Sequence, residues 1–348
     1  MADSTHRRQP PPLALAVLVA GAVVVLQALL VPLFSGIAAN LEPRDLPVVV
    51  AGPPPAAADF AGRLEAAQPG AFDVTMVADE AAADQALRDR EAYAAFVLGP
   101  SGASLHTASA ASPTVAAALT QAATQLAGGQ QPTVVDVVPT DPDDPRGAGF
   151  ASGFLPLAMT SMLAGILLAL LVPGRGPRVL GLVTFAVLAG LVGAAVVQSW
   201  LGLLPGDFLL NAAVIGLFAL AASATVAGLG ALLGAPGIGL GALLVFLLGN
   251  PLSAVSAAPE LLPQPWGVVG QWLPVGAGGT LLRSTAYFDG AGGTRALWVL
   301  VGYALIGLAL AVVGRATIAR APAATTRAAE EAAVAREAAR RLGAVASN

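Results

Sequence analysis

Acid/base or metal chemistry in this chain would have to come from its carboxylates and its two histidines, because the sequence contains no cysteine. His6 and His106 lie far apart in the sequence, unlike the clustered ligands of a metal site. Around His106 we find no nucleophile–His–carboxylate order and no recognisable acid/base pair among the carboxylates Asp59, Glu65, Asp79, Glu80 and Glu91. We therefore predict no catalytic, cofactor-binding or metal-binding residues, and we expect His106 at the surface of a strand.

Three aspartates in the segment Pro139–Pro145 raise the hypothesis of a calcium loop. A loop of the EF-hand type also needs further ligands, a glycine and a closing glutamate at fixed spacing, which the segment around Asp141, Asp143 and Asp144 lacks. We interpret the proline-punctuated segment as a rigid, solvated linker.

Every basic residue apart from the histidines is arginine, because the sequence contains no lysine. A phosphate-binding P-loop requires a lysine that reaches the nucleotide phosphates, so the chain cannot be its own ATP-driven motor. The net charge of −4 does not indicate a nucleic-acid partner. We expect no enzyme activity, and any ATPase would be a separate subunit.

Hydrophobic residues make up 56% of the chain and charged residues only 11%, against about a quarter charged in soluble domains. A membrane-spanning helix needs roughly 20 apolar residues. Segments that meet or approach this length are Leu13–Phe34, Phe150–Val172, Val179–Trp200, Phe208–Leu233 and Leu297–Gly314. A further apolar segment, Ile238–Leu248, meets Gly249-Asn250-Pro251 and resumes as Leu252–Ala258, so we expect a broken helix there. The sequence thus predicts six transmembrane helices in a 1+5 arrangement.

No charged residue lies within any of these spans, which argues against ion-coupled transport. Uncharged polar residues do occur there, and hydrogen bonding between helices would explain most of them. Asn250 and Ser253 lie at the helix break, and they are our candidates for a substrate route. Gly230, Gly234, Gly237 and Gly241 have the spacing of close helix packing, whereas a nucleotide-binding glycine motif would need a preceding strand.

Arginines before the first span, between the second and third spans and after the last span would lie on one side of the membrane, which the positive-inside rule identifies as the cytoplasm. We expect a multi-pass plasma-membrane protein with cytoplasmic tails at residues 1–12 and 315–348, the latter partly helical over Ala323–Val345. A cleaved signal peptide is the alternative for residues 13–34, although the apolar core is longer than signal peptides have. Within the five-helix region 150–314, residues 259–295 would be external. Here Gly267–Leu273 and Gly278–Phe288 would be re-entrant or surface-lying, and Trp266 and Trp272 would be interfacial anchors.

The polar segment 35–149 is expected to form a small extracytoplasmic α/β domain with a mixed sheet. Segments rich in β-branched residues predict strands at Leu46–Ala51, Phe72–Ala78, Tyr93–Gly99 and Thr133–Pro139, with a weaker one at Ala103–Ala108. Helical composition predicts helices at Ala56–Ala67, Asp79–Arg90 and Pro113–Ala127, with Asp79 as an N-cap.

This layout resembles the permeases of type-2 ATP-binding-cassette exporters, and more narrowly their YhgE / phage-infection-protein branch with its actinobacterial relatives. The closest match runs from Gly249-Asn250-Pro251-Leu252-Ser253 through Ala258–Pro263 and Gly270–Gly278 to Phe288-Asp289-Gly290. The resemblance implies a homodimeric or heterodimeric permease that moves an amphipathic or hydrophobic substrate outward with a separate ATPase subunit. The short loop 173–178 and the proline-containing N-terminal tail depart from this pattern, which leaves the C-terminal tail for ATPase docking. The alternative is a non-transporting envelope scaffold or surface receptor that uses its α/β domain.

Overall fold

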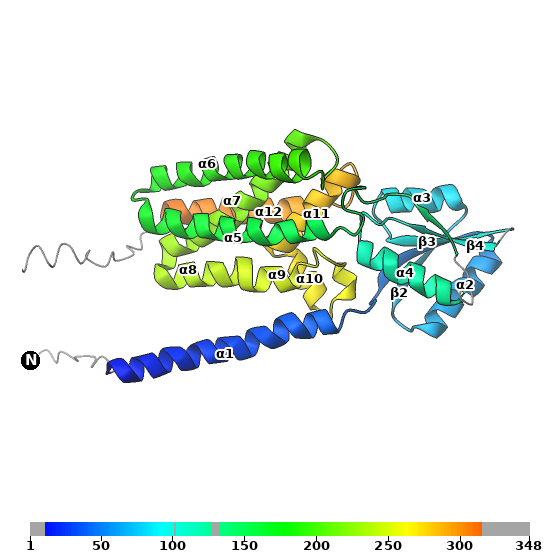
Figure 1. The fold of residues 1–348 in the computed structure, drawn as a ribbon, viewed down its shortest axis with the longest axis horizontal. Coiled ribbons are helices and arrows are strands. Elements are labelled where there is room, and N and C mark those ends of the chain that lie inside the picture. The colour runs from blue at the N-terminus through cyan, green and yellow to red at the C-terminus, as the bar shows by residue number, and fades with distance from the viewer. Residues whose placement is uncertain (1–10, 101, 127–131, 315–348) are drawn as a thin grey trace, which may run out of the picture.

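The computed structural model describes residues 11–100, 102–126 and 132–314. It consists of a bundle of long helices with an α/β domain at one end (Figure 1). We call this end of the bundle the domain end and the opposite end the tail end. The predicted helix Ala323–Val345 and the residues His6, Arg7 and Arg8 lie outside the described residues.

Six helices of the described chain are long and apolar enough to cross a membrane. They are α1 (Pro12–Ala39), α5 (Ala148–Leu171), α6 (Arg175–Ala194) with its π-helical continuation η1 (Ala195–Trp200), α7 (Phe208–Leu233), the composite of α8 (Ala235–Ala242), η2 (Leu243–Leu248) and α9 (Gly249–Leu252), and α12 (Thr294–Val313). The prediction of a polytopic helical protein with six candidate spans is confirmed by the length and composition of these helices. Most of their bounds lie within a few residues of those expected.

Helix α7 forms the centre of the bundle. In α7 78% of the most apolar 18-residue window is buried, against at most 33% in the other five spans. Small residues let the neighbouring backbones approach it. A Cβ on Gly190 of α6 would lie 2.3 Å from the Ala212 carbonyl oxygen, and a Cβ on Gly228 would lie 2.4 Å from that of Gly307 in α12. Glycine is therefore required where α6 and α12 cross α7.

The fifth span differs from its predicted course. Its interruption is the π-helical segment η2, which widens the turn before the expected break. The helix then continues through Pro251 and ends at Leu252, so the predicted resumption over Leu252–Ala258 is wrong. Pro251 stands in the last turn of this composite helix, one residue before its end.

Two short helices follow at the domain end, after the 3₁₀ turn η3 (Pro259–Leu261): α10 (Trp266–Gln271) and α11 (Pro274–Tyr287). We predicted that Gly278–Phe288 would be re-entrant or surface-lying. The surface-lying alternative is wrong, because α11 is buried along most of its length and packs on α7 and α12. The backbone approach is close, since a Cβ on Gly270 would lie only 1.6 Å from the Leu252 carbonyl oxygen. The segment after the fifth span is therefore folded back into the bundle.

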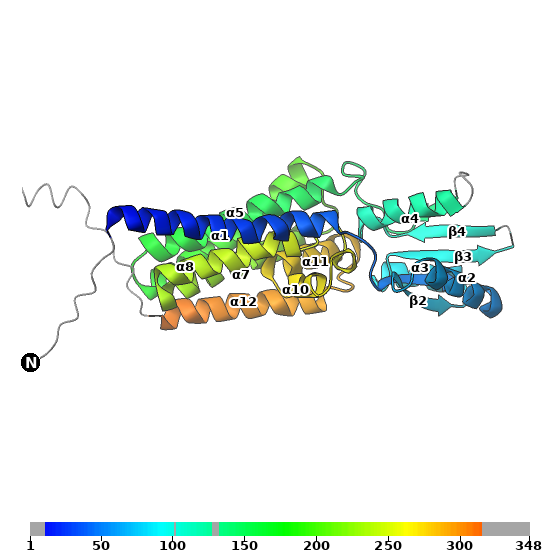
Figure 2. The same ribbon diagram turned by 90° about the horizontal axis from the view of Figure 1, so that it is seen from below.

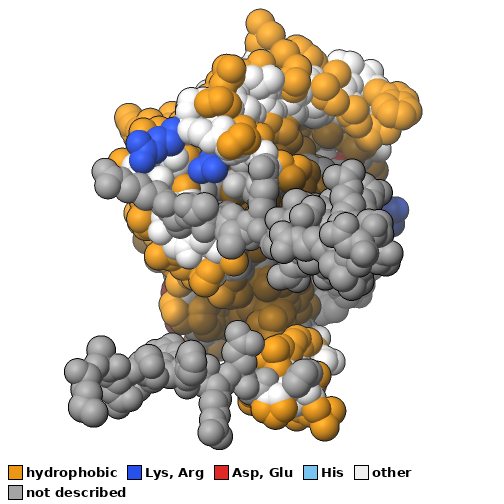
Figure 3. Space-filling model, turned by 90° about the vertical axis from the view of Figure 1, so that its left-hand side faces the viewer, with side chains coloured by type: hydrophobic (Ala, Val, Ile, Leu, Met, Phe, Trp, Pro, Cys, Tyr) orange, Lys and Arg blue, Asp and Glu red, His pale blue; other side chains and the backbone are white. Residues whose placement is uncertain are grey.

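Helix α1 stands apart from the other spans (Figure 1), and seen from below it crosses in front of the bundle (Figure 2). Its apolar 18-residue window is not buried at all, and it meets the bundle only near its C-terminal end. There Ile37 and Leu33 pack with Leu252, Leu262 and Leu273. Figure 3, viewed from the tail end, shows hydrophobic side chains around the bundle and over α1. These surfaces have the character expected of protein that faces lipid.

The α/β domain contains a five-stranded sheet in the order β2-β1-β3-β4-β5. Its strands are β1 (Leu46–Ala51), β2 (Phe72–Val77), β3 (Ala94–Gly99), β4 (Gly102–Thr107) and β5 (Thr133–Asp136). The β3–β4 pair is antiparallel and the other pairs are parallel, which confirms the expected mixed sheet. The predicted N-cap is also confirmed, because the Asp79 carboxylate accepts a hydrogen bond from the Ala82 N–H at 2.9 Å.

Helices cover both faces of this sheet. The strand alternation sends Val48 and Val50 toward α2 (Pro54–Ala67) and α4 (Pro113–Leu126), whereas Val49 and Ala51 pack against α3 (Glu80–Arg88). Both cores extend into the bundle, since the first includes Ala257, Ala258 and Leu261 and the second includes Phe288. The α/β domain and the domain end of the bundle thus share apolar cores.

The segment Pro139–Pro145 is not the fully solvated linker that we predicted. Asp144 is buried, and its carboxylate accepts hydrogen bonds from the N–H groups of Gly149 (3.1 Å) and Phe150 (2.8 Å) at the start of α5. A carboxylate is favoured there because the first N–H groups of a helix have no partner within the helix. The acidic segment therefore ends in a cap for the second span.

We expect Asp144→Ala to destabilise the protein by about 1–2 kcal/mol, the usual cost of a lost N-terminal cap. Asp143→Ala is the matched control, because Asp143 is exposed and its carboxylate has no hydrogen bond within the described chain. Thermal unfolding in detergent compares the two variants. Equal unfolding temperatures would contradict the capping role of Asp144.

Candidate functional site

An apolar groove on the side of the bundle has a volume of about 790 Å³. Its walls are α12 on one side and the α8–η2 segment on the other, and α7 contributes Thr225 and Leu229. We call it the lateral groove. Its lining residues are Thr225, Leu229, Leu240, Leu244, Trp272, Arg295, Trp298, Val299, Gly302, Tyr303, Ile306, Gly307 and Leu310. An apolar cavity with few polar groups is the usual form of a ligand pocket.

The polar side chains of the lateral groove lie mainly at its domain end. Arg295 is in the first turn of α12, and Trp298 follows one turn later. Trp272 directly follows α10 and is 55% exposed, and Trp266 at the start of α10 is 41% exposed. The structure therefore brings one predicted interfacial anchor, Trp272, to the groove, while Trp266 lies outside the lining.

Asn250 and Ser253, our candidates for a substrate route, lie at the end of the fifth span. Both side chains bond to backbone carbonyls of the same segment: Asn250 Nδ2 donates to Phe246 O at 3.0 Å, and Ser253 Oγ donates to Asn250 O at 2.8 Å. Neither residue lines the lateral groove. Their role in a substrate route remains a prediction.

The four glycines predicted for helix packing have different surroundings. A Cβ on Gly237 would lie 1.9 Å from Leu229 O, and one on Gly241 would lie 2.8 Å from Val226 Cα, so both glycines touch α7. Gly230 of α7 faces the Ile238 side chain. Gly234 has a positive φ of 72° in the turn between α7 and α8, which other residues rarely adopt.

A half-buried arginine, Arg90, and a buried arginine, Arg283, lie where the α/β domain meets the bundle. Arg90 Nη1 donates to Thr280 O at 3.0 Å and to the Ser284 hydroxyl, and its guanidinium lies 5.6 Å from the centre of the Phe288 ring. Desolvation in this environment lowers the pKa of Arg90. The second arginine, Arg283 of α11, is 6% exposed.

Arg283 Nη2 donates to Val255 O at 2.8 Å, and its guanidinium stacks 4.7 Å from the centre of the Phe150 ring. Within the described residues neither Arg90 nor Arg283 forms a salt bridge. Sequence reasoning missed both as structural residues. The sequence did contain one signal. Arg283 lies in a segment that we expected outside the membrane, where the positive-inside rule disfavours arginine.

A tyrosine and a glutamate add a polar contact to this junction. The Tyr93 hydroxyl donates to Glu260 Oε2 at 2.8 Å. Burial, followed by the nearby Glu260 carboxylate, raises the pKa of Tyr93, so the phenol stays protonated as a donor. The junction is therefore built from buried, directed hydrogen bonds as well as apolar contacts.

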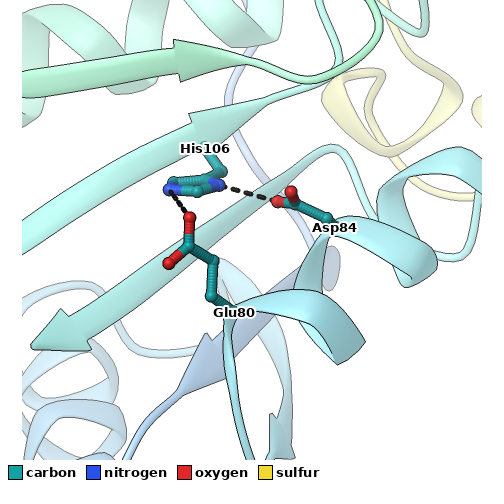
Figure 4. Close-up of side chains that lie close together, drawn as sticks. All are labelled: Glu80, Asp84 and His106. Carbon is teal, nitrogen blue, oxygen red and sulfur yellow. Dashed lines mark hydrogen bonds and ion pairs between the residues drawn. The ribbon is translucent and has the colours of Figure 1, made fainter.

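His106 is buried, with 2% exposure, so its expected surface position is wrong. It lies on β4 and faces α3, where Asp84 Oδ1 is 2.7 Å from Nδ1 and Glu80 Oε1 is 3.8 Å from Nε2 (Figure 4). One ligand atom from each of these three residues lies within 4.8 Å of the others, so the cluster could hold a metal ion. Sequence reasoning missed the cluster because Glu80 and Asp84 share a helix face, while the histidine comes from a strand placed against it only by the fold.

The Asp84–His106 contact is expected to stabilise the α/β domain. Asp84→Asn replaces a charged acceptor beside a buried imidazole, and we expect a loss of about 1–2 kcal/mol. Asp59→Asn is the control, because Asp59 pairs with Arg63 on an exposed helix surface, where such a pair contributes under about 0.5 kcal/mol. Denaturant unfolding measures the difference in stability between the two variants, and hydrogen exchange of the β4 amides measures the difference in local protection. Equal protection in both variants would show that the contact carries no stability.

The chain matches none of the protein-family models, curated proteins or solved structures with which it was compared. The class defined by the fold alone is a helical membrane protein with six candidate spans and a small α/β domain. The resemblance to type-2 exporter permeases therefore rests on the layout and on the segment from Gly249 to Gly290.

Proposed function

We propose that this chain is the permease-like subunit of an ABC-type exporter, moving an unidentified amphipathic or hydrophobic substrate outward. The observation that carries the proposal is the fifth span, interrupted by η2 and followed by α10 and α11, which fold back into the domain end. Irregular backbone at membrane depth is tolerated only where protein or a cavity covers it, and transporters commonly have broken helices at their substrate routes.

The proposed orientation puts the α/β domain outside and both tails in the cytoplasm of a plasma membrane. It is supported by Arg175 and Arg178, which stand at the start of α6 at the tail end, opposite the α/β domain (Figure 1). The described part of α1 begins at that end and α12 finishes there (Figure 1). Arginine on one side is the expected pattern for cytoplasmic loops.

The proposed assembly is a homodimer, or a heterodimer with a related permease, together with a separate ATPase. The exposed apolar surface of α1 is compatible with a second permease subunit, because α1 meets its own bundle only near its C-terminal end. The chain lacks an ATP-binding motif, so the energy would come from the partner ATPase.

The proposed substrate route at the end of the fifth span is tested with Asn250→Leu. We expect the export rate to fall about fivefold, which corresponds to the roughly 1 kcal/mol of one polar contact. Thr160→Val is the control. The Thr160 hydroxyl also donates a hydrogen bond to its own helix, to Pro156 O at 2.8 Å, but Thr160 is exposed on the surface of α5. The measurement is the cellular accumulation of a panel of fluorescent amphiphiles in a deletion strain that expresses each variant at equal level. Unchanged export by Asn250→Leu would leave Asn250 with only a packing role, and an unchanged accumulation in the deletion strain itself would count against export.

The alternative function is an envelope scaffold or surface receptor that uses the α/β domain. It is favoured by a cavity of about 660 Å³ between α4, β5 and the segment before α5, with polar residues in its lining. Those polar residues are Thr107, Ser109, Thr120, Gln121, Asp136, Thr140 and Asp141. Under this alternative, Gln121→Leu would abolish the cellular phenotype of the protein, whereas loss of any ATPase subunit would leave it unchanged.

A further inference from the structure

We propose that the lateral groove binds an anionic lipid from the membrane leaflet at the domain end, with its headgroup at Arg295 and an acyl chain along α12. This inference concerns a bound lipid, and it holds whether or not the chain is an exporter. It rests on the charge at the mouth of the groove, the depth of the groove and the open space inside it.

The charge at the groove mouth has no ion-pair partner among the described residues. Arg295 is exposed, and it forms no salt bridge with any residue that the structure describes. It also occupies the first turn of α12, where the helix dipole disfavours a cation and favours an anion. An anionic headgroup would interact favourably with both the guanidinium and the helix N-terminus, so the site selects negative charge.

The depth of the groove fits a chain that starts at the membrane surface. Trp272 and Trp298 stand beside Arg295, and tryptophan favours the level of the lipid headgroups. From Arg295 to Leu310 the groove follows α12 for about 22 Å at the α-helical rise. This length exceeds half of a hydrocarbon core of about 30 Å, so the groove has room for an acyl chain that crosses one leaflet.

The middle of the groove is open beside Gly302. A Cβ added to Gly302 would meet no atom within 4 Å, although the residue lines the groove. One turn and a half later, Gly307 packs directly on the Ala224 backbone and closes the floor. The space is therefore continuous along α12 above a tightly packed α7–α12 contact, as an acyl chain requires.

A second copy of this chain is a poorer occupant than a lipid. Its six spans supply apolar side chains but no aspartate or glutamate within their hydrophobic segments to pair with Arg295. An unpaired charge in such an interface would be costly. An anionic lipid satisfies the groove and the arginine together.

Native mass spectrometry of the full-length protein, purified and incubated in micelles with phosphatidylglycerol or with phosphatidylcholine of identical chains, tests the proposal. We expect the wild type to retain one phosphatidylglycerol per chain, at least about fivefold more tightly than phosphatidylcholine. Arg295→Gln should remove that preference, because an arginine near an anionic lipid headgroup contributes about 1 kcal/mol, a factor of about five. Since Arg295 is exposed, this variant is expected to fold.

A second pair of variants tests the apolar part of the site. Gly302→Trp should fill the groove and reduce retention of both lipids, whereas Gly153→Trp on α5 should not, although its Cβ position is equally open. Equal retention of the two lipids by the wild type, or an unchanged preference in Arg295→Gln, would overturn the proposal. So would a wild-type dimer that carries no lipid and dissociates on Gly302→Trp, which would identify the groove as a subunit interface.

Discussion

Gly228→Leu is expected to prevent the bundle from assembling and to leave the protein aggregated or degraded. A Cβ at residue 228 would lie 2.4 Å from the Gly307 carbonyl oxygen and 2.9 Å from Leu310 Cβ, and neither contact is with a flexible side-chain end. Overpacking a well-packed core costs about 1–3 kcal/mol and more where backbone must move, and here two central helices would have to separate. The measurement is the monodisperse yield in detergent, followed by thermal unfolding.

Gly153→Leu is the matched control for this prediction. It also introduces a leucine into a span, but a Cβ at residue 153 would meet no atom within 4 Å. Its yield and unfolding temperature should stay close to wild type. A well-folded Gly228→Leu protein with a normal unfolding temperature would contradict the described α7–α12 crossing.

Arg90→Met is expected to weaken the contact between the α/β domain and the bundle without unfolding either part. The substitution keeps apolar bulk against Phe288 but removes the hydrogen bonds to Thr280 O and the Ser284 hydroxyl. Hydrogen bonds from a charged group contribute about 1.5–3 kcal/mol, and a buried acceptor left unpaired adds a similar cost. We therefore expect a loss of about 2–4 kcal/mol in the contact between the two parts.

Hydrogen–deuterium exchange measures this effect locally. In Arg90→Met, exchange should rise in α11 and in the loop around Glu260, while β1 and β3 stay protected. Arg63→Met is the control, because Arg63 is exposed and pairs only with Asp59 on α2. Protection of α11 equal to that of the wild type would mean that Arg90 does not hold the junction.

Hydrophobic segments and strand alternation carry much of the fold in the sequence. The span Phe208–Leu233 could be predicted to the residue, because Asp207 and Gly234 bound a continuous apolar run. The weaker strand around His106 formed fully as β4, and it pairs with β3 in an antiparallel hairpin. In these places local composition and tertiary packing favour the same structure.

Other features depend on contacts that no local pattern contains. The π-helical turn in the fifth span and the burial of α11 follow from packing against α7, which periodicity does not reveal. The Asp84–His106 contact joins a helix to a strand, and the Arg90 contacts join the α/β domain to α11. The lateral groove is likewise assembled from four segments distant in sequence. Trp272 could be predicted as an interfacial anchor from its residue type and its place in the sequence. Nothing in the sequence indicates that Gly302 and Arg295 line the same groove as Trp272.

Isolation of the tagged protein from its native membranes most directly tests the proposed dependence of this permease-like chain on a separate ATPase. After mild cross-linking and affinity purification, quantitative mass spectrometry measures the partners and their ratio to the permease. We expect a nucleotide-binding subunit in a ratio near one to one, enriched over a matched membrane-protein control. Recovery of the cross-linked protein without any such subunit would contradict it.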